Sequence, residues 1–275
     1  MLIDGLSLSK KIRNQIKLEI EENGYTPGLC VIIVGEDKAS NKYVNMKKKA
    51  CEEAGIYSTV HRLKEDVSEK ELIDVITQIN NINKIDGILI QLPLPKHINQ
   101  NNILEQVSKE KDVDGFHPYN IGCLTANLES FVPCTPLGIM EMFKEYNIDL
   151  YGKNVCMIGA SNIVGRPMAS LLINNEATVT VIQKSVSSLK EHTLKADIII
   201  VATGVINLLT KDMVNKDAII IDVGINQNDK GFLVGDADFN NLKDKVKMIT
   251  PVPGGVGPMT IAMLLSNTLK AYKLK

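Results

Sequence analysis

A tyrosine and a lysine stand four residues apart, at Tyr43 and Lys47, in the segment ASNKYVNMKKKACEEAG. In a helix, residues at i and i+4 share one face, so the two side chains would point into the same space. A lysine whose pKa is lowered by burial and by cationic neighbours can exchange protons, and Lys42, Lys48 and Lys49 supply such neighbours. From spacing alone, however, a solvated basic helix face with a half-buried tyrosine is the more common explanation.

Other polar residues stand where a predicted strand ends. Gln91 closes the run DGILIQL, and open α/β sheets bind ligands beyond the carboxyl ends of their strands. In KDVDGFHP, Asp112 and Asp114 precede Gly115, and a carboxylate there either caps its own backbone or binds an amino-pyrimidine ring. His117 is interpreted as structural. The four histidines form no metal-ligand spacing, so we expect no metal.

The strongest local motif is VCMIGASNIVGRPMASLL, in which Gly159 and Gly165 flank a turn between a strand and a helix. Glycine permits a sharp turn and close approach of the backbone to a ligand. The helix that follows offers N–H groups and a positive dipole end to a phosphate. The motif is neither the strict G-x-G-x-x-G pattern nor a P-loop. We interpret it as a dinucleotide-binding turn, with an ordinary strand–helix turn as the alternative.

The end of the next predicted strand, TVTVIQKSVSSL, indicates the type of dinucleotide. NAD enzymes usually place an acidic residue there for the ribose 2′-hydroxyl, whereas NADP requires positive charge. Lys184 stands at this position beside Ser185, without an acid, and Arg166 in the first loop is a second candidate phosphate partner. The pattern favours NADP over NAD, although an exposed loop lysine is also common without any such role.

Composition limits the class of protein. The 275 residues are 44% hydrophobic and 23% charged, with a net charge of −1, which is typical of one large or two ordinary globular domains. This charge gives no general attraction to nucleic acid or membranes. Five scattered cysteines argue against a disulfide framework or a structural zinc site and favour a reducing compartment. We expect a cytoplasmic protein, because neither a signal peptide nor an apolar run of ~20 residues is evident.

Alternating strands and helices must position these residues. In the first half, the predicted elements are a strand at 29–35, a helix at 40–54, a strand at 58–63, a helix at 68–82 and a strand at 86–92. Ser68 and Glu71 form the pattern of a capping box at the start of the second helix. This order predicts an α/β fold with a doubly wound parallel sheet.

The alternation then restarts. A helix is predicted at 135–148, with Pro136 in its first turn, as the link to a second α/β half. The elements predicted after it are a strand at 153–159, a helix at 165–174 and strands at 177–183, 196–203 and 217–226. The unusual segment PVPGGVGPMT, with three glycines and three prolines, follows at 251–260 and precedes an apolar stretch.

Together these motifs resemble, along nearly the whole chain, the bifunctional methylenetetrahydrofolate dehydrogenase/methenyltetrahydrofolate cyclohydrolase family. Each motif alone is weak, but their order and spacing are highly specific. The matching stretches are VGEDKASNKYVNMKKKACEEAGI, GILIQLPLP, KDVDGFHP, PCTPLGIMEM, GASNIVGRPMASLL, IIDVGIN, GDADF and PVPGGVGPMT.

The resemblance implies two α/β domains facing each other across a cleft: a folate-binding catalytic domain at 1–134 plus 259–275 and a Rossmann-type NAD(P)-binding domain at 135–258. PVPGGVGPMT would cross back over the cleft, with Pro258 starting the returning helix. The implied activity is NADP-dependent oxidation of 5,10-methylenetetrahydrofolate to 5,10-methenyltetrahydrofolate, then hydrolysis to 10-formyltetrahydrofolate. A dehydrogenase with weak or absent cyclohydrolase activity is the alternative. The implied partners are the folate and a second copy, in a homodimer through the cofactor domain, with neither nucleic acid nor membrane.

The resemblance also implies roles for individual residues. Tyr43 would lie against the pterin, Lys47 would be the acid/base of the cyclohydrolase step, Gln91 would hydrogen-bond and position Lys47, and Asp114 would grip the pterin's amino and ring N–H groups; these four are the predicted catalytic residues. The predicted substrate-binding residues are Tyr43, Gln91, Leu92, Pro93, Asp114, Pro253, Gly254 and Gly255. The predicted cofactor-binding residues are Gly159, Ala160, Ser161, Ile163, Val164, Gly165, Arg166, Lys184, Ser185, Thr203, Gly204, Ile225, Gly257 and Thr260.

The chain departs from the family pattern at a few positions. Many relatives have arginine where Ala160 stands, and the usual His-Ser or His-Arg after the second cofactor-domain strand is Gln183-Lys184, so both positions bear on the choice of dinucleotide. Ala237 replaces a usual valine, which we interpret as packing. The alternatives are another two-domain NADP dehydrogenase, of the shikimate or amino-acid type, and a nucleotide-responsive binding protein without catalysis; the motif PGGVGPMT and the intact polar set argue against them.

Overall fold

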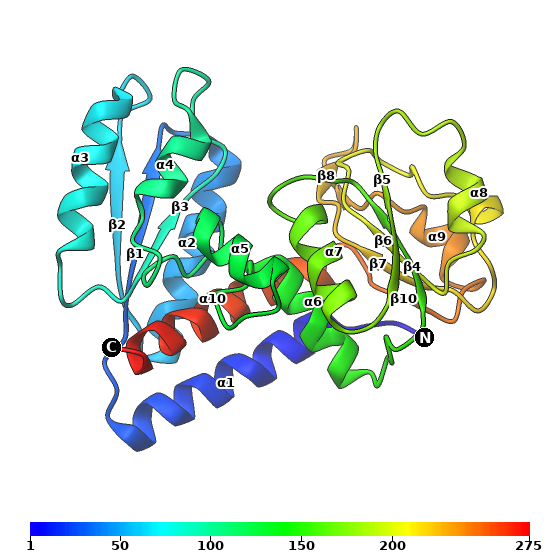
Figure 1. Ribbon diagram of the computed structural model, residues 1–275, viewed down its shortest axis with the longest axis horizontal. Coiled ribbons are helices and arrows are strands. Elements are labelled where there is room, and N and C mark those ends of the chain that lie inside the picture. The colour runs from blue at the N-terminus through cyan, green and yellow to red at the C-terminus, as the bar shows by residue number, and fades with distance from the viewer. The chain divides into compact units, whose positions relative to one another are not determined.

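The computed structural model in Figure 1 describes residues 1–275, apart from the side chains of residues 38 and 39. The described chain forms two compact units, which are named here after their main sheets. The three-stranded unit contains Lys10–Cys123, Glu129–Cys134 and Ile261–Lys275. The five-stranded unit contains Met1–Ser9, Leu124–Leu128 and Thr135–Thr260. Helices α1 (Gly5–Asn23) and α10 (Val256–Lys273) contribute residues to both.

The sheet of the three-stranded unit is parallel throughout. It contains β1 (Gly28–Val34), β2 (Tyr57–Leu63) and β3 (Gly87–Ile90), in the order β2-β1-β3. Helices α2 (Lys38–Ala54) and α3 (Glu69–Asn80) make the connections between successive strands. Since β2 lies on one side of β1 and β3 on the other, the chain reverses its direction of winding at β1. This switch point, beyond the carboxyl ends of β1 and β3, is where open α/β sheets bind ligands.

Branched apolar side chains of α3 hold this helix against the sheet. Leu72, Ile76 and Ile79 are buried and pack in one cluster with Ile88 and Ile90 of β3. Burying each such side chain contributes ~1.5–3 kcal/mol to folding. The shorter helices α4 (Gln100–Gln106) and α5 (Pro118–Thr125) follow β3. The sheet edge near the switch point is therefore built on a rigid, well-packed layer.

The predicted capping box begins α3. Glu71 N donates to Ser68 Oγ at 3.2 Å, and Ser68 N donates to a carboxylate oxygen of Glu71 at 2.9 Å. These reciprocal bonds satisfy backbone donors that have no partner within the helix. The capping box predicted from Ser68 and Glu71 is therefore confirmed.

The main sheet of the five-stranded unit is also parallel. Its strands, in the spatial order β10-β7-β6-β4-β5, are β10 (Met248–Ile249), β7 (Ile219–Asp222), β6 (Ile198–Val201), β4 (Asn154–Ile158) and β5 (Thr178–Ile182). The helices of this unit include α6 (Cys134–Glu145), α7 (Gly165–Asn174), α8 (Leu189–Thr193) and α9 (Phe239–Leu242). Two short antiparallel strands, β8 (Asn226–Gln227) and β9 (Leu233–Val234), form a separate hairpin. The switch point of the main sheet lies between β4 and β6.

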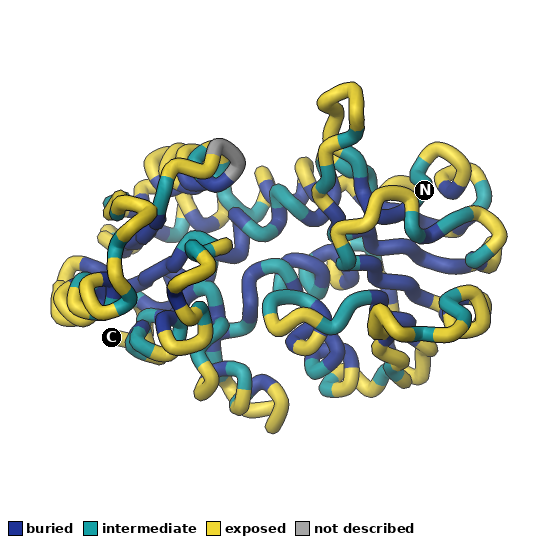
Figure 2. The backbone as a smooth tube through the Cα atoms, turned by 90° about the horizontal axis from the view of Figure 1, so that it is seen from above, coloured by how far each residue is buried: buried dark blue, intermediate teal, exposed yellow. Residues whose placement is uncertain are grey.

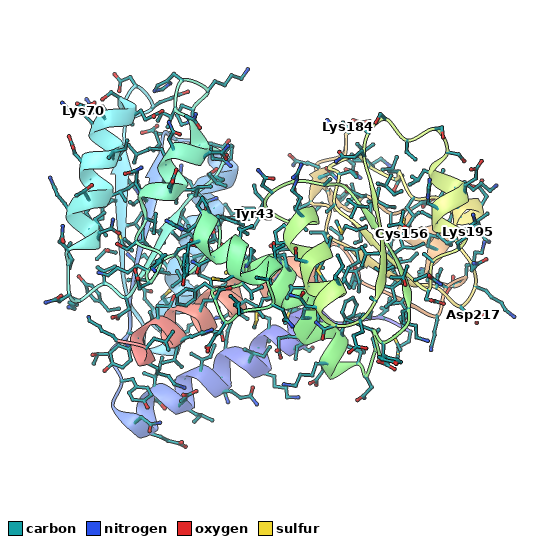
Figure 3. The ribbon with its side chains drawn as sticks, in the orientation of Figure 1. Tyr43, Lys70, Cys156, Lys184, Lys195 and Asp217 are labelled. Carbon is teal, nitrogen blue, oxygen red and sulfur yellow. The ribbon has the colours of Figure 1, made fainter. Side chains whose placement is uncertain are left out.

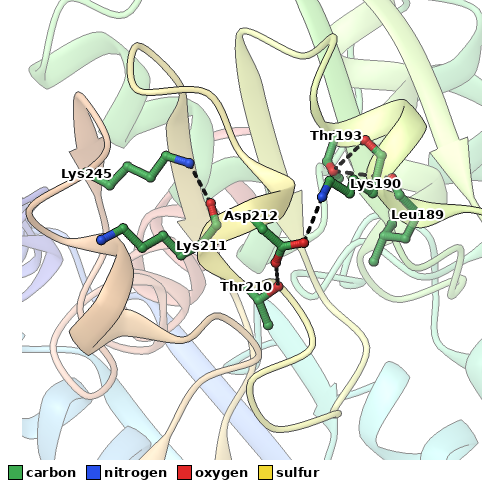
Figure 4. Close-up of polar contacts among 7 residues, drawn as sticks. All are labelled: Leu189, Lys190, Thr193, Thr210, Lys211, Asp212 and Lys245. Atoms are coloured by element: carbon green, nitrogen blue, oxygen red, sulfur yellow. Dashed lines mark hydrogen bonds and ion pairs between the residues drawn. The ribbon is translucent and has the colours of Figure 1, made fainter.

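Polar side-chain contacts join separate segments of this unit, as Figure 4 shows. Asp212, in the 3-10 helix η1 (Lys211–Met213), accepts hydrogen bonds from Thr210 Oγ1 at 2.6 Å and from Lys190 Nζ at 2.9 Å. These two bonds lower the pKa of Asp212 to about 2. Lys245 Nζ donates to the backbone oxygen of Lys211 at 2.6 Å. The contacts join α8 and the segment after α9 to η1.

The structure confirms the predicted α/β fold with parallel sheets, and Figure 2 shows buried backbone in the interior of each unit with exposed loops around it. Several boundaries differ from expectation. The strand predicted at 217–226 is only Ile219–Asp222, and the helix predicted at 135–148 ends at Glu145. The last helix begins at Val256, two residues before Pro258. Proline fits the first turn of a helix because its missing N–H group has no intrahelical acceptor there. Among the described helices, none has the length and hydropathy needed to span a bilayer.

Candidate active site

Lys47 and Gln91 meet at the switch point of the three-stranded unit. Lys47 lies on α2, and Gln91 directly follows β3. Lys47 Nζ donates to Gln91 Oε1 at 3.0 Å, while Gln91 Nε2 donates to the backbone oxygen of Leu92 at 2.8 Å. The second bond holds the amide with its oxygen toward the lysine. The contact between Gln91 and Lys47 that the resemblance implied is therefore present.

The environment of Lys47 favours its neutral form. The residue is only 9% exposed, and burial lowers the pKa of its amine because removal from water penalises the ammonium. The carboxylate of Asp114 opposes this shift by attracting the charged form. A lysine in this state can accept and release a proton more readily near neutral pH than a solvated one.

Tyr43 shares α2 with Lys47, as the i, i+4 spacing predicted, and is labelled in Figure 3. Its ring is half-buried, and burial raises the pKa of the phenol. The hydroxyl group therefore keeps its proton near neutral pH and is available as a hydrogen-bond donor. Leu92 is partly buried and Pro93 is exposed in the loop that follows Gln91.

The two carboxylates of KDVDGFHP have different environments. Asp112 is 4% exposed and accepts hydrogen bonds from the backbone N–H groups of residues 115–117 at 2.7–3.2 Å. It also accepts one from Asn120 Nδ2 at 2.8 Å. Asp112 therefore caps its own loop. Asp114 interacts electrostatically with Lys47 instead, so of the two carboxylates the backbone-capping role belongs to Asp112.

Asp114 is a carboxylate whose ionisation is tuned by its surroundings. Burial raises its pKa to about 6, against the opposing effects of the Lys47 ammonium and a hydrogen bond with Cys134. Burial also raises the pKa of the Cys134 thiol well above its usual value, so the thiol remains protonated. Near pH 7 the carboxylate is mostly ionised and can accept hydrogen bonds from a ligand.

Two residues that sequence reasoning missed support Asp114. Cys134 was treated only as a scattered cysteine, although it stands in the matching stretch PCTPLGIMEM. Asn267 of α10 is 3% exposed, and its Nδ2 donates to the backbone oxygens of Val113 at 2.8 Å and Val132 at 3.0 Å. These bonds fix the backbone next to Asp114. No local sequence pattern around Asn267 indicates this contact.

The turn after β4 in the five-stranded unit requires both of its glycines. A Cβ atom on Gly165 would lie 2.0 Å from the backbone oxygen of Gly159, which no side chain permits. Gly159 has a φ of +109°, and a Cβ there would lie 2.3 Å from the backbone oxygen of Ala202. The backbone of this turn is thus packed more closely than any residue with a Cβ allows. This close packing fits the shape of a dinucleotide-binding turn.

The amino end of α7 follows this turn and lies at the carboxyl edge of the sheet. Its N-cap, Val164, has a hydrocarbon side chain that cannot accept a hydrogen bond. The positive end of the helix dipole is therefore available to an anionic group. Arg166 is exposed, and its Nε donates to the backbone oxygen of Ala160 at 3.2 Å. Ser161 contributes its Oγ as acceptor for Val164 N at 3.2 Å.

Most of the predicted cofactor-binding residues follow the carboxyl ends of neighbouring strands, which meet at one edge because all of these strands are parallel. Residues 159–166 follow β4, residues 184 and 185 follow β5, residues 203 and 204 follow β6, and residue 225 follows β7. Lys184 and Ser185 are both exposed, and Figure 3 labels Lys184. Gly257 lies beside Ile225, with 3.5 Å between a Cβ built on it and Ile225 Cδ1.

The segment PVPGGVGPMT packs on the start of α1 within the same unit. Leu6 N donates to the backbone oxygen of Gly254 at 2.9 Å, and a Cβ on Gly5 would lie 2.0 Å from the backbone oxygen of Gly255. Thr260 Oγ1 is 2.9 Å from Thr135 Oγ1, a hydrogen bond that joins α10 to α6. The glycines of this segment therefore permit close backbone packing. Pro253, Gly254 and Gly255 belong to the five-stranded unit, whereas the other predicted substrate-binding residues belong to the three-stranded unit.

Comparison with known proteins identifies the family. The model of the tetrahydrofolate dehydrogenase/cyclohydrolase catalytic domain matches residues 3–114, and the model of the NAD(P)-binding domain of the same family matches residues 133–275. The chain belongs to the tetrahydrofolate dehydrogenase/cyclohydrolase family. The five-stranded unit, which carries most of the second match, contains the glycine turn described above.

Relatives within the family match over almost the whole chain. The bifunctional protein FolD of Aliarcobacter butzleri is 58% identical, with 100% of this chain and 97% of that protein covered. The crystal structure of the bifunctional FolD methylenetetrahydrofolate dehydrogenase/cyclohydrolase of Campylobacter jejuni superposes with a TM-score of 0.97 at 51% identity, covering 100% of this chain and 99% of that one. The family resemblance and the predicted pair of activities, dehydrogenase and cyclohydrolase, are therefore confirmed.

One solved relative contains a dinucleotide. The methylenetetrahydrofolate dehydrogenase-cyclohydrolase of Trypanosoma brucei, complexed with NADP cofactor and an inhibitor, has a TM-score of 0.95 and 34% identity to this chain. The alignment covers 100% of this chain and 97% of that structure. Among the described side chains, no group of three or more histidine, cysteine, aspartate or glutamate residues is arranged to hold a metal ion.

Proposed function

We propose that this enzyme oxidises 5,10-methylenetetrahydrofolate to 5,10-methenyltetrahydrofolate with NADP and then hydrolyses the product to 10-formyltetrahydrofolate. The observation that carries the proposal is the buried Lys47, whose amine is hydrogen-bonded to Gln91 and lies in the field of Asp114. Its pKa is lowered by burial, as a hydrolytic acid–base group requires. We assign folate binding to residues 1–134 plus 259–275 and dinucleotide binding to residues 135–258.

The folate is held chiefly by Asp114. An ionised carboxylate can accept two hydrogen bonds, and the amino group and the neighbouring ring N–H of the pterin supply a matching pair of donors. Tyr43 lies against the pterin ring and orders the site around Lys47. The remaining substrate contacts that we propose are made by Gln91, Leu92, Pro93, Pro253, Gly254 and Gly255.

The oxidation needs positioning more than proton transfer. A bound NADP supplies the acceptor for the hydride. The methylene carbon lies between two nitrogens, so the positive charge left when its C–H bond breaks is shared with them and no base is required. Asp114 and Tyr43 therefore contribute by fixing the orientation of the folate, which is the main source of rate enhancement for such a step.

The hydrolysis does need proton transfer. Water adds through its oxygen to the methenyl carbon, and neutral Lys47 takes a proton from that water. The bond from this carbon to N5 then breaks, N5 gains a proton, and the carbon remains on N10 as a formyl group; one proton is released overall. Gln91 Oε1 accepts one hydrogen bond from the Lys47 amine. Because the amine uses an N–H group in this contact, its nitrogen lone pair is directed elsewhere and can accept a proton.

Dinucleotide binding is proposed for the carboxyl edge of the five-stranded unit. The pyrophosphate would lie against the turn from Gly159 to Gly165, where close backbone packing and the dipole of α7 favour an anion. Lys184, Ser185 and Arg166 supply positive charge and hydroxyl donors for the 2′-phosphate of NADP. The other proposed contacts are Ala160, Ser161, Ile163, Val164, Thr203, Gly204, Ile225, Gly257 and Thr260.

We further propose a homodimer through the cofactor unit. Strand β5 lies at the edge of the sheet, and its residues Thr178, Thr180 and Val181 are exposed. Val181 is 39% exposed, and Ile173 on the preceding helix is 60% exposed. An exposed edge strand of this kind is a common place for a second copy to pair. Light scattering tests this: we expect a dimeric wild type and a monomeric Val181→Lys variant, and a monomeric wild type would contradict the proposal.

We also propose that the enzyme acts in the cytoplasm.

The proposed activities are tested by two assays. In the first, methylenetetrahydrofolate is offered with NADP or with NAD, and reduced dinucleotide is followed by absorbance. In the second, methenyltetrahydrofolate alone is offered, and its hydrolysis is followed by loss of near-ultraviolet absorbance. Turnover in both assays with NADP preferred is expected. A protein that oxidises the methylene compound but does not accelerate hydrolysis would be a dehydrogenase only.

A further inference from the structure

The motif GDADF contains a fully buried carboxylate that no step of the proposed mechanism uses. Asp236 is 0% exposed and lies between β9 and α9 in the five-stranded unit. Among the described residues, its Oδ2 accepts from Thr203 N at 2.6 Å, Thr203 Oγ1 at 2.9 Å and Gly204 N at 2.9 Å. Its Oδ1 accepts from Asn226 Nδ2 at 2.8 Å. Hydrogen bonds of this kind offset the high cost of burying a carboxylate.

The donors belong to two loops at the edge where we propose that the dinucleotide binds. Thr203 and Gly204 follow β6, and Asn226 begins β8 at the end of the segment that follows β7. One carboxylate therefore fixes the segments that follow two adjacent strands, β6 and β7. The loop after β6 borders the switch point of the sheet, where ligand contacts are expected.

The same bonds couple Asp236 to the glycine turn. In a trans peptide the carbonyl points away from the N–H group, so the bond to Thr203 N turns the carbonyl of Ala202 away from Asp236. This carbonyl oxygen lies 2.3 Å from the position of a Cβ on Gly159. A shift of the Thr203 backbone would therefore also disturb the packing of the turn after β4.

A second buried carboxylate holds Asp236 in place. Asp222, the last residue of β7, accepts from Gly224 N at 3.0 Å and from Asp236 N and Ala237 N at 2.9 Å each. A Cβ on Gly224 would lie 2.1 Å from Asp236 Oδ1, and one on Gly235 would lie 1.8 Å from Asp222 Oδ2. The loop backbones are thus packed directly on the two carboxylates, which leaves Asp236 little freedom to move.

We propose that Asp236 is a positioning residue for the dehydrogenase step, which sets the backbone of Thr203 and Gly204 and the side chain of Asn226 in the conformation that receives the dinucleotide. The proposal rests on the proposed function, because it takes this edge to be the dinucleotide site. The chemistry requires a carboxylate, since both of its oxygens face only donors. An amide would place an NH₂ group against one of these donors.

The decisive variant is Asp236→Asn. We expect its Kd for NADPH, measured by fluorescence titration, and its KM for NADP to rise about 10-fold or more, because a charge-assisted hydrogen bond is replaced by opposed donors. The cyclohydrolase rate, assayed with methenyltetrahydrofolate and no dinucleotide, should stay within about twofold of the wild type. A general folding defect would lower both activities together, so the separation distinguishes positioning from structural support.

A compensating exchange sharpens the test. In the double variant Asp236→Asn/Asn226→Asp the amide at 236 can donate to the new carboxylate at 226 and still accept from Thr203 and Gly204. NADPH affinity should then recover to within about threefold of the wild type. Thr203→Val, the matched variant, removes the hydroxyl that donates to Asp236 and accepts from Val205 N but keeps the Thr203 N–H donor, so it should weaken binding less than Asp236→Asn.

The outcomes separate this inference from the proposed function. A wild type that does not bind NADPH would overturn both. A wild type that binds NADPH, together with a folded Asp236→Asn protein of unchanged affinity or with equal loss of both activities, overturns the positioning role alone. If Asp236→Asn does not fold, Asn226→Ala removes the donor to Oδ1 while retaining the carboxylate, and it must weaken NADPH binding for the inference to stand.

Discussion

Lys47 Nζ donates to Gln91 Oε1 across 3.0 Å, and the other end of the same amide is held by the backbone oxygen of Leu92. The two contacts give the amine a fixed acceptor on one side. A neutral amine in this position keeps a lone pair for a proton of water, whereas an ammonium has only donors. We therefore expect the protonation state of Lys47 to control the rate of hydrolysis.

Changing the charge of Gln91 tests this control. Gln91→Glu places a carboxylate beside the amine, which stabilises the ammonium and raises the pKa of Lys47. The rising limb of the cyclohydrolase rate should therefore move to higher pH than in the wild type. The measurement is kcat for methenyltetrahydrofolate hydrolysis against pH, with Gln91→Met as the uncharged control. Superimposable profiles for wild type and Gln91→Glu would show that the amine does not titrate in the rate-limiting step.

Removing the charge of Asp114 should weaken both activities. Asp114→Asn loses a charged hydrogen bond to the pterin, worth about 1.5–3 kcal/mol, which corresponds to a KM for folate raised roughly 10- to 150-fold. Both reactions are affected because we propose that one folate site serves them. The change also removes the carboxylate that raises the pKa of Lys47, so the pH profile of hydrolysis should move to lower pH. Normal folate KM values in a folded variant would refute the assignment.

Much of this site follows from local sequence patterns. The spacing of Tyr43 and Lys47 predicts one helix face, and the end of an apolar run predicts Gln91 at a strand end; β3 stops at Ile90, one residue before it. The capping box at Ser68 is equally local. These features depend on neighbours within a few residues, and helix and strand periodicity encode such neighbours directly.

Other contacts depend on residues far apart in the chain. Asn267 and Val113 are separated by 154 residues. No periodic pattern in the sequence predicts that the last helix contacts the loop that contains Val113 and Asp114. The sequence also left open which of Asp112 and Asp114 caps the loop, because both residue types suit a turn. Only the folded backbone determines that the loop N–H groups face Asp112. Strand β10 contains only Met248 and Ile249, too few residues for a recognisable alternation.

The preference for NADP is tested at Lys184. The exposed ammonium follows β5, and removing it in Lys184→Ala should raise KM for NADP far more than KM for NAD, since only NADP carries the 2′-phosphate. Lys190, whose amine is paired with Asp212, offers a matched control lysine in the same unit, and Lys190→Ala should change neither value. A wild type that uses NAD better than NADP would make this interpretation of the strand end wrong.

We expect substitution of Lys47 to separate the two proposed reactions. Lys47→Met keeps much of the apolar stem but has no amine, so hydrolysis should fall by about 10²–10⁴-fold while oxidation survives in part. Lys47→Arg should also fail in hydrolysis, because a guanidinium remains charged and cannot act as a base. The methenyl compound should then accumulate in the coupled reaction. Equal loss of both activities in folded Lys47→Met, checked by circular dichroism, would mean that the lysine mainly positions substrate.

Stability should depend on pH through Asp222. Its burial raises the pKa of this carboxyl to about 6, whereas the unfolded value is about 3.9. Between about pH 4 and pH 6 the folded protein retains a proton that the unfolded chain has lost. The contribution of Asp222 to stability is therefore greatest below pH 4 and falls by about 3 kcal/mol as pH rises to 6, above which it is constant.

Asp222→Asn cannot titrate and should lack this dependence. Its hydrogen bonds to the 224 and 236–237 backbone change as well, but that effect is the same at every pH and shifts the whole curve. The measurement is the free energy of unfolding in urea at pH 4, 5, 6 and 7 for both proteins. Since Asp114 titrates in both, the difference between the two curves isolates Asp222. The wild type should lose stability relative to the variant from pH 4 to 6, and parallel curves would mean that Asp222 has an ordinary pKa in the folded enzyme.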